Sequence, residues 1–98
     1  MKEKAIRVTL LKLKPGLEQL LVPELVPLIQ AGRSIEGCLS FDLYQLSQDR
    51  STLVLHEIWT TRQAMQAYTF GPLKAEMANL LTRFLVDPLR EWEVEEVF

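Results

Sequence analysis

Three side chains that can do chemistry lie close together between Leu53 and Tyr68. The alternation in LVLHEIW predicts a β-strand with Glu57 and Trp59 on the same face. Thr61 is suited to cap a following short helix, which brings Tyr68 next to that face. An indole supplies an apolar wall, a desolvated carboxylate accepts protons, and a phenol donates a hydrogen bond to an oxyanion. The stretch therefore predicts one wall of a small-molecule pocket.

Each of these residues also has a purely structural role to weigh. Arg7 lies on the same face of a predicted neighbouring strand, so an ion pair with Glu57 is an alternative to proton transfer. Trp59 alone is typical of core packing, and Tyr68 of an amphipathic residue at a helix edge. The hydroxyl groups of tyrosine and threonine both donate and accept hydrogen bonds, so Tyr68 and Thr9 are candidates to orient a substrate.

His56 is the only histidine, and histidine commonly exchanges a proton near neutral pH. Alternation with Val54 and Ile58 predicts that it faces the helices as a structural residue. If the hairpin register differs by one residue, Asp42 lies opposite His56 and forms an acid–base pair with it. His56 and Glu57 are thus the two candidate proton acceptors.

The elements that position these residues follow the order β-α-β-β-α-β. The first helix begins at Leu17, contains Pro23 and Pro27, and is expected as one kinked helix or two short ones. Gly71-Pro72 separates the two parts of the second helical region. Strands are predicted at residues 4–13, 38–46, 52–60 and 89–98. This pattern predicts a single α+β domain, residues 1–98, with a ferredoxin-like antiparallel sheet and helices on one face.

The alternation also predicts which strand residues face the helices. Ile6, Val8 and Leu10 are expected there, together with Leu39, Phe41 and Leu43. The opposite face is then too apolar for water, so we expect a second copy of the chain to cover it in a homodimer, leaving a dry hollow beside Trp59. That face is predicted to carry Thr9, Ser40, Tyr44, Leu55, Trp59 and Trp92.

Composition excludes several classes of function. Of the 98 residues, 48% are hydrophobic and 24% charged, with a net charge of −2, which gives no basis for binding nucleic acid. No apolar run reaches the ~20 residues that cross a membrane, and no signal peptide is expected. Cys38 is the only cysteine, so a cysteine–histidine metal site lacks ligands, and a cytoplasmic location is expected.

Several segments together resemble the antibiotic biosynthesis monooxygenase family. They are VTLLKLKPG, EGCLSFDLYQ, LVLHEIWTTRQAMQAY, Gly71-Pro72 and DPLREWEVEEV. The resemblance implies a dimeric α+β barrel of two ferredoxin-like units, each with a pocket between sheet and helices. It implies oxygenation of quinols or polycyclic phenols without a cofactor in some members. Other members degrade haem or isomerise small molecules.

The resemblance also implies roles for individual residues. Trp59 matches the strand tryptophan that lines the pocket of active members, and Thr9 stands where haem-degrading relatives carry an asparagine. Tyr68 and Leu73 occupy positions that are often histidine. Because the helix histidine that binds haem iron is replaced, we expect no haem and no other cofactor.

The leading interpretation is an enzyme that oxygenates a planar quinol-like or phenolic substrate with O2. Leu11, Leu55, Trp59 and Tyr44 are expected to bind the substrate, and the base is Glu57 or His56. The alternatives are a homodimer that binds a small hydrophobic ligand without catalysis, or an isomerase of the same fold.

Overall fold

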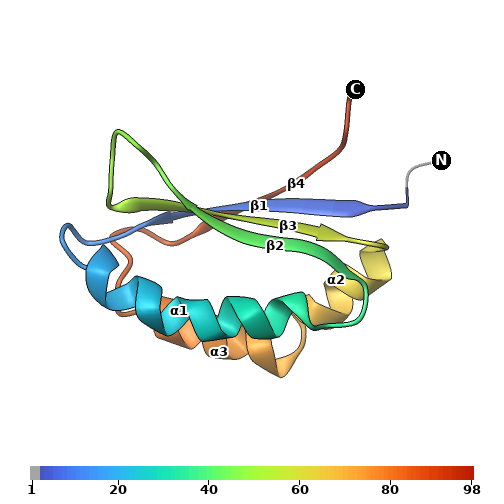
Figure 1. Ribbon diagram of the computed structural model, residues 1–98, viewed down its shortest axis with the longest axis horizontal. Coiled ribbons are helices and arrows are strands. Elements are labelled where there is room, and N and C mark those ends of the chain that lie inside the picture. The colour runs from blue at the N-terminus through green and yellow to red at the C-terminus, as the bar shows by residue number, and fades with distance from the viewer. Residues whose placement is uncertain (1–2) are drawn as a thin grey trace.

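The computed structural model describes residues 3–98. Its strands form one antiparallel sheet in the order β2-β3-β1-β4, and the helices cover one face of it (Figure 1). This confirms the predicted ferredoxin-like α+β fold, with the acidic last strand at an edge. In chain order the elements are β1 (Ala5–Lys12), α1 (Glu18–Arg33), β2 (Cys38–Gln45), β3 (Thr52–Trp59), α2 (Arg62–Thr69), α3 (Pro72–Leu81) and β4 (Arg90–Val94).

Helix α1 is one helix despite its two internal prolines. Pro23 and Pro27 are four residues apart and both are exposed, so they share the solvent side of the helix. The carbonyl groups that lose a partner there can bond to water, which makes the prolines tolerable. The buried side carries Leu21, Leu25 and Ile29, whereas Leu20 is 62% exposed.

The helices cover the opposite face of β1 and β3 from the one predicted. On β1, Arg7, Thr9 and Leu11 are buried, whereas Ile6, Val8 and Leu10 are only half-buried. Both faces of these strands are largely apolar, so alternation alone does not determine which one faces the helices. The predicted choice was wrong because a face that carries charges can be buried when the charges pair. On β3 the buried residues are Leu53, Leu55, Glu57 and Trp59.

Strand β2 begins with an irregularity that reverses one further prediction. Cys38 lies opposite Trp59 and Ser40 lies opposite Ile58, which leaves Leu39 as an extra residue between them. Cys38 therefore packs against the core, and Leu39 is 54% exposed instead of buried. Phe41 is buried, as predicted.

The two helices after β3 meet at a tight corner. The Thr61 hydroxyl accepts a hydrogen bond from the Ala64 backbone N–H at 3.0 Å and so caps α2, as predicted. Gly71 precedes Pro72, the first residue of α3. A side chain at Gly71 would lie 3.0 Å from the Ala67 carbonyl oxygen, so the corner is closely packed.

The face of the sheet away from the helices has no covering layer in the described chain (Figure 1). Tyr44, Trp92 and Val94 are 55%, 46% and 41% exposed, and Val8 pairs with Trp92 across the strands. The placement of Tyr44 and Trp92 on this face is as predicted, whereas Thr9, Leu55 and Trp59 lie on the other face. None of the helices in residues 3–98 is long and apolar enough to span a bilayer.

Candidate active site

A buried ion pair lies at the centre of the helix-covered face. Arg7 and Glu57 are opposite each other on β1 and β3. The Arg7 Nη2 and Nε groups donate to the two oxygens of Glu57 at 2.8 and 3.2 Å. Burial lowers the pKa of Arg7, but the hydrogen bonds and negative charge of Glu57 outweigh it, so the pKa is raised and Arg7 stays charged. The ion-pair alternative for Glu57 is confirmed.

Trp59 is locked against this pair. Its Nε1 group donates to Glu57 Oε1 at 3.0 Å, and its ring meets Phe41 edge-on at 6.3 Å between centroids. The indole is 0% exposed, so no void that admits a water molecule touches it. The hollow expected beside Trp59 is therefore filled by protein side chains. A planar ligand can reach the indole only if one of these neighbours moves.

Tyr68 is the neighbour that stacks on the indole. Its ring stacks on Trp59, with centroids 5.1 Å apart and planes inclined by 22°. Although Tyr68 is buried, its hydroxyl donates only to the sulfur of Met77, at 3.9 Å, and a thioether is a weak acceptor. Burial, followed by the negative charge of Glu57, raises the pKa of Tyr68, so the phenol stays neutral. The site thus contains a buried hydrogen-bond donor without a strong acceptor.

A second layer of polar contacts links the site to the edge of the molecule. Arg7 Nη1 donates to Thr69 Oγ1 at 2.8 Å, which ties β1 to the end of α2. Lys74, in the first turn of α3, forms an ion pair with Glu91 of β4, and the Thr9 hydroxyl donates to Glu91 at 3.4 Å. We did not single out Lys74 or Glu91 from the sequence. The signal for Lys74 was a cation in the first turn of a helix, where the dipole disfavours it.

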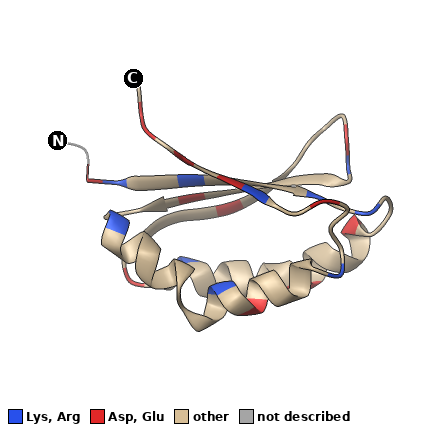
Figure 2. Cartoon of the chain, turned by 180° about the vertical axis from the view of Figure 1, so that it is seen from behind, with Lys and Arg blue, Asp and Glu red and all other residues tan. Residues whose placement is uncertain are grey.

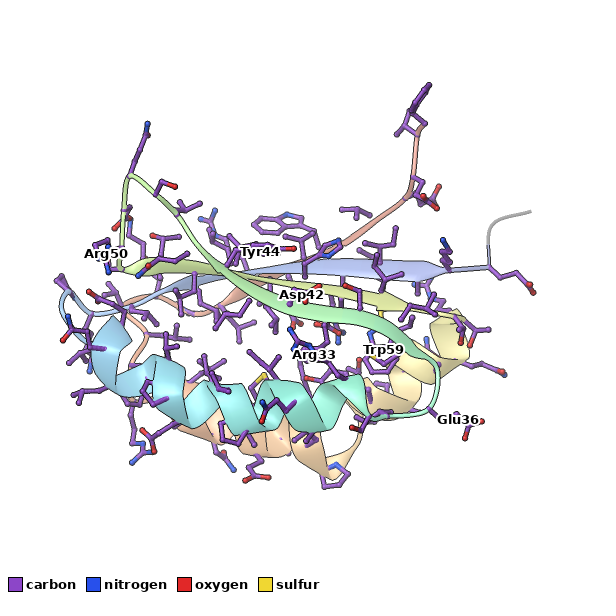
Figure 3. All side chains as sticks on the ribbon, viewed as in Figure 1. Arg33, Glu36, Asp42, Tyr44, Arg50 and Trp59 are labelled. Carbon is purple, nitrogen blue, oxygen red and sulfur yellow. The ribbon has the colours of Figure 1, made fainter. Side chains whose placement is uncertain are left out.

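Six of the predicted site residues lie on the helix-covered face: Thr9, Leu11, Leu55, Glu57, Trp59 and Tyr68. The other two lie on the uncovered face, so they are separated from Trp59 by the sheet. His56 lies there with the half-buried Val54 and Ile58, which corrects our expectation that it faces the helices. Tyr44 is exposed on the same face. Figure 3 shows Trp59 in the layer between sheet and helices and Tyr44 on the other side.

His56 has an acidic residue as its cross-strand neighbour on the uncovered face. Asp42 lies directly opposite it on β2, which is the alternative register considered from the sequence. Asp42 accepts a hydrogen bond from Ser40 at 2.5 Å and forms an ion pair with Arg33 at 2.9 Å. These two contacts hold the pKa of Asp42 below its usual value. Figure 2 marks acidic and basic residues on the backbone, and both kinds occur on the sheet as well as on the helices, with acidic residues recurring along β4 and the segment after it.

A surface hollow elsewhere does not coincide with this site. It measures about 430 Å³ and lies between the start of β1 and the end of β4. Its lining includes Glu3, Lys4, Arg62 and Glu93 and none of the predicted site residues. Residues 3–98 contain no cluster of three or more histidine, cysteine or acidic side chains arranged for a metal ion.

The sequence was compared with family models and with curated proteins. Residues 5–76 match the model of the antibiotic biosynthesis monooxygenase family. The chain belongs to this family. Among curated proteins, none matches it. The buried Trp59 and Tyr68 of this antibiotic biosynthesis monooxygenase domain both lie within the matched residues.

Solved structures agree on the fold of the antibiotic biosynthesis monooxygenase domain. Rv0793 from Mycobacterium tuberculosis is 21% identical, with a TM-score of 0.86 over 97% of this chain and 96% of that one. A conserved protein from Methanosarcina mazei Go1 is 19% identical, with a TM-score of 0.90 over 97% and 94%. A structure described as an antibiotic biosynthesis monooxygenase is 18% identical, with a TM-score of 0.87 over 95% and 98%. At these identities the similarity establishes the fold alone.

Proposed function

We propose that this chain is a cofactor-independent monooxygenase that oxidises a small quinol-like or polycyclic phenolic compound with O2. The site is the cluster around Trp59 and Tyr68. The observation that supports it most directly is the hydroxyl of Tyr68, which is buried with only the Met77 sulfur as acceptor. A buried donor normally has a good acceptor, and a substrate oxygen supplies one.

The roles of the residues follow from their contacts. Trp59 is held by Phe41 and Glu57, so it provides a fixed surface for an aromatic ring. Tyr68 moves away from the indole, lets the substrate into the stack, and donates its hydrogen bond to the substrate oxygen. We propose that the Gly71-Pro72 corner provides this movement, because it joins the end of α2 to α3. Thr9, Leu11 and Leu55 complete the wall along β1 and β3.

The chemistry needs no group beyond the substrate and O2. A deprotonated anthrone or quinol is electron-rich and transfers an electron to O2, and the two radicals combine to a peroxide. The peroxide anion takes up a proton to give a hydroperoxide. Its carbon then loses the remaining C–H proton as the O–O bond breaks and hydroxide leaves, and the hydroxide and this proton form water. For an anthrone, the methylene carbon becomes a carbonyl with one oxygen atom, and the other leaves as water. The protein excludes water and stabilises the negative oxygen of the intermediate.

Glu57 is better suited to hold this site than to take a proton. Its carboxylate accepts from Arg7 twice and from Trp59 once, so three of its roughly four lone-pair sites are engaged. We therefore assign Glu57 to fix Arg7 and the indole. His56 lies across the sheet from Trp59, so it belongs to the other face.

We also propose that the protein works as a homodimer. The uncovered face of the sheet carries the half-buried Ile6, Val8 and Ile58 and the exposed Trp92, and a second copy is the partner with a matching surface. The cytoplasmic location expected from the sequence stays a prediction.

Oxygen consumption tests the proposed reaction. Purified protein is mixed with hydroquinones and anthrones, and uptake is followed with an oxygen electrode. The proposal expects turnover above the uncatalysed rate and its loss in Trp59→Ala. Uptake equal to background with every compound that binds would sink the enzymatic proposal.

The filled core around Trp59 favours a second candidate, a dimer that binds a small hydrophobic ligand without turning it over. Leu73, where relatives often have histidine, packs against the core and contributes no acid or base. Ligand binding without oxygen uptake would support this candidate. Conversion of a bound compound to an isomer without oxygen uptake would support the isomerase alternative.

A further inference from the structure

The carboxylates that reach the candidate site are already committed to partners. Glu57 accepts three hydrogen bonds, from Arg7 and Trp59. Glu91 is paired with Lys74 and accepts from Thr9. Among the described residues that contact this cluster, neither carboxylate is free to act as a base. A substrate that arrives with its negative charge already formed needs no such base.

Two positive charges, by contrast, lie near the Tyr68 ring. Arg7 Cζ and Lys74 Nζ are each 5.8 Å from the centroid of the Tyr68 ring. Arg7 is fixed by its two bonds to Glu57 and by Thr69. Lys74 is held differently, because its partner Glu91 is on the edge strand β4 and both side chains retain some exposure, at 17% and 27%.

The position of Lys74 is costly for a residue with a merely structural role. It lies in the first turn of α3, where the partial positive charge of the helix N-terminus disfavours a cation. It also lies two residues after Pro72, at the corner through which we propose that the site opens. Because Lys74 Nζ is 5.8 Å from the centroid of the Tyr68 ring, separation of the ion pair would leave a cation beside the site.

We propose that the site selects aromatic compounds that carry a negatively charged oxygen, and that Lys74, once separated from Glu91, recognises this charge. Tyr68 donates to the same oxygen. The inference rests on the proposed function for the location of the site. It adds that the ligand is negatively charged and that Lys74 binds this charge. Glu91 then acts as an internal competitor, because it occupies Lys74 while the ligand is absent.

A different result is expected if the Lys74–Glu91 ion pair only stabilises the packing of α3 against β4. If Lys74 and Glu91 only hold the two elements together, removing either charge has the same effect on ligand binding. If Glu91 competes with the ligand, the two substitutions have opposite effects. Glu91→Gln frees Lys74 and strengthens anion binding, whereas Lys74→Gln weakens it.

Binding of 2-naphthoate and of its neutral counterpart 2-naphthamide tests this. The two probes have the same ring system and nearly the same shape, and only the first is charged at neutral pH. Affinities are measured by titration calorimetry with the full chain and with Glu91→Gln, Lys74→Gln and Lys74→Arg. Glu76→Gln, an exposed site on the same helix, and Lys12→Gln, an exposed site on β1, are the controls with matched charge changes.

The expected result is a preference for naphthoate, raised on the order of tenfold by Glu91→Gln and lost in Lys74→Gln, since a charge-assisted hydrogen bond changes affinity by about this factor. Lys74→Arg keeps the preference, and the controls leave it unchanged. In the unmodified protein, added salt weakens naphthoate binding more than naphthamide binding, which tests the inference even if a variant fails to fold.

Equal affinity for the two probes, or parallel effects of Glu91→Gln and Lys74→Gln, would overturn the inference. Absence of binding by both probes would overturn it as well. Oxygen uptake with the anthrone panel is measured separately. Uptake without charge preference therefore rejects only this inference, whereas charge preference without uptake rejects only the oxygenase.

Discussion

The rings of Trp59 and Tyr68 stack face to face, 5.1 Å apart, and this contact joins strand β3 to helix α2 at the point where both elements end. Offset aromatic stacking contributes about 0.5–1.5 kcal/mol beyond the burial of surface. In the proposed site, the Tyr68 ring thus occupies the place of the ligand, and it does so at a strength that a bound aromatic ring can replace.

Replacing Tyr68 by phenylalanine separates the stack from the hydroxyl. Tyr68→Phe retains the ring, and the lost bond to the Met77 sulfur is weak, so the free energy of unfolding at neutral pH should change by less than about 1 kcal/mol. Loss of an oxyanion donor typically lowers turnover by roughly a hundredfold or more. Urea unfolding and oxygen uptake with the same preparation check both parts. Unchanged turnover would remove Tyr68 from the proposed mechanism.

Tyr68 should also make the free energy of unfolding decrease at alkaline pH. Burial raises the pKa of Tyr68 above its ordinary value of 10.0, so the unfolded chain loses this proton at a lower pH than the folded chain. The contribution of Tyr68 is complete below about pH 10 and is lost as the pH rises further. Urea midpoints measured from pH 8 upward should fall more steeply for the unmodified protein than for Tyr68→Phe. Parallel curves would contradict the assigned burial effect.

The Arg7–Glu57 pair should be costly to break and inexpensive to remove whole. Arg7→Met leaves the buried Glu57 charge unpaired and should lower the free energy of unfolding by about 3–5 kcal/mol. The double change Arg7→Met with Glu57→Gln, which keeps an acceptor for the Trp59 Nε1 group, should recover most of this loss. The exposed pair Arg62–Glu93 is the control, since Arg62→Met should cost no more than about 1 kcal/mol. Equal costs in the two pairs would contradict the assigned burial.

The buried pair also explains which part of the molecule could be predicted from its sequence. Turn residues such as Pro15-Gly16 and Gly71-Pro72 mark the element boundaries, and the order of elements determines the fold. By contrast, the sequence does not determine which face of β1 and β3 the helices cover. Ile6 and Val8 are as apolar as Leu11 and Leu13, so the decision depends on a pairing between Arg7 and Glu57, which are fifty positions apart.

The candidate site was likewise predictable only in part. Glu57, Trp59 and Tyr68 belong to one continuous segment, so their proximity follows from local structure. Lys74 and Glu91 meet only because α3 packs beside the edge strand β4, and no spacing in the sequence expresses that contact. The facing of His56 depends on the same choice of strand face as Arg7 and Glu57.

Gly37 should be the glycine most sensitive to substitution at the site end of the sheet. Its φ is +89°, and an added Cβ would lie 2.6 Å from the Ala64 side chain of α2. Gly37→Ala therefore combines backbone strain with a collision and should cost about 2–4 kcal/mol. Gly16 is a matched control, because its φ is +83° but no atom lies within 4 Å of the added Cβ. Gly16→Ala should cost about 1 kcal/mol, and urea unfolding of the two variants isolates the effect of the collision.

The uncovered sheet face gives the prediction on which the homodimer depends. Trp92 is 46% exposed on edge strand β4, next to Val8 and on the same face as Tyr44. In a two-fold dimer each substitution is present twice, so Trp92→Glu places two unpaired carboxylates at one interface. This variant should sediment as a monomer at micromolar concentration, where the unmodified chain sediments as a dimer.

Leu20→Glu is the control for that experiment, since Leu20 is 62% exposed on the solvent side of α1 and its substitution should leave the dimer intact. Dimer formation should also shield the Trp92 indole, whereas Trp59 is enclosed in either state. Quenching of tryptophan fluorescence by acrylamide should therefore increase on dilution, and Trp92→Phe should abolish this dependence. An unmodified chain that sediments as a monomer at micromolar concentration would overturn the homodimer.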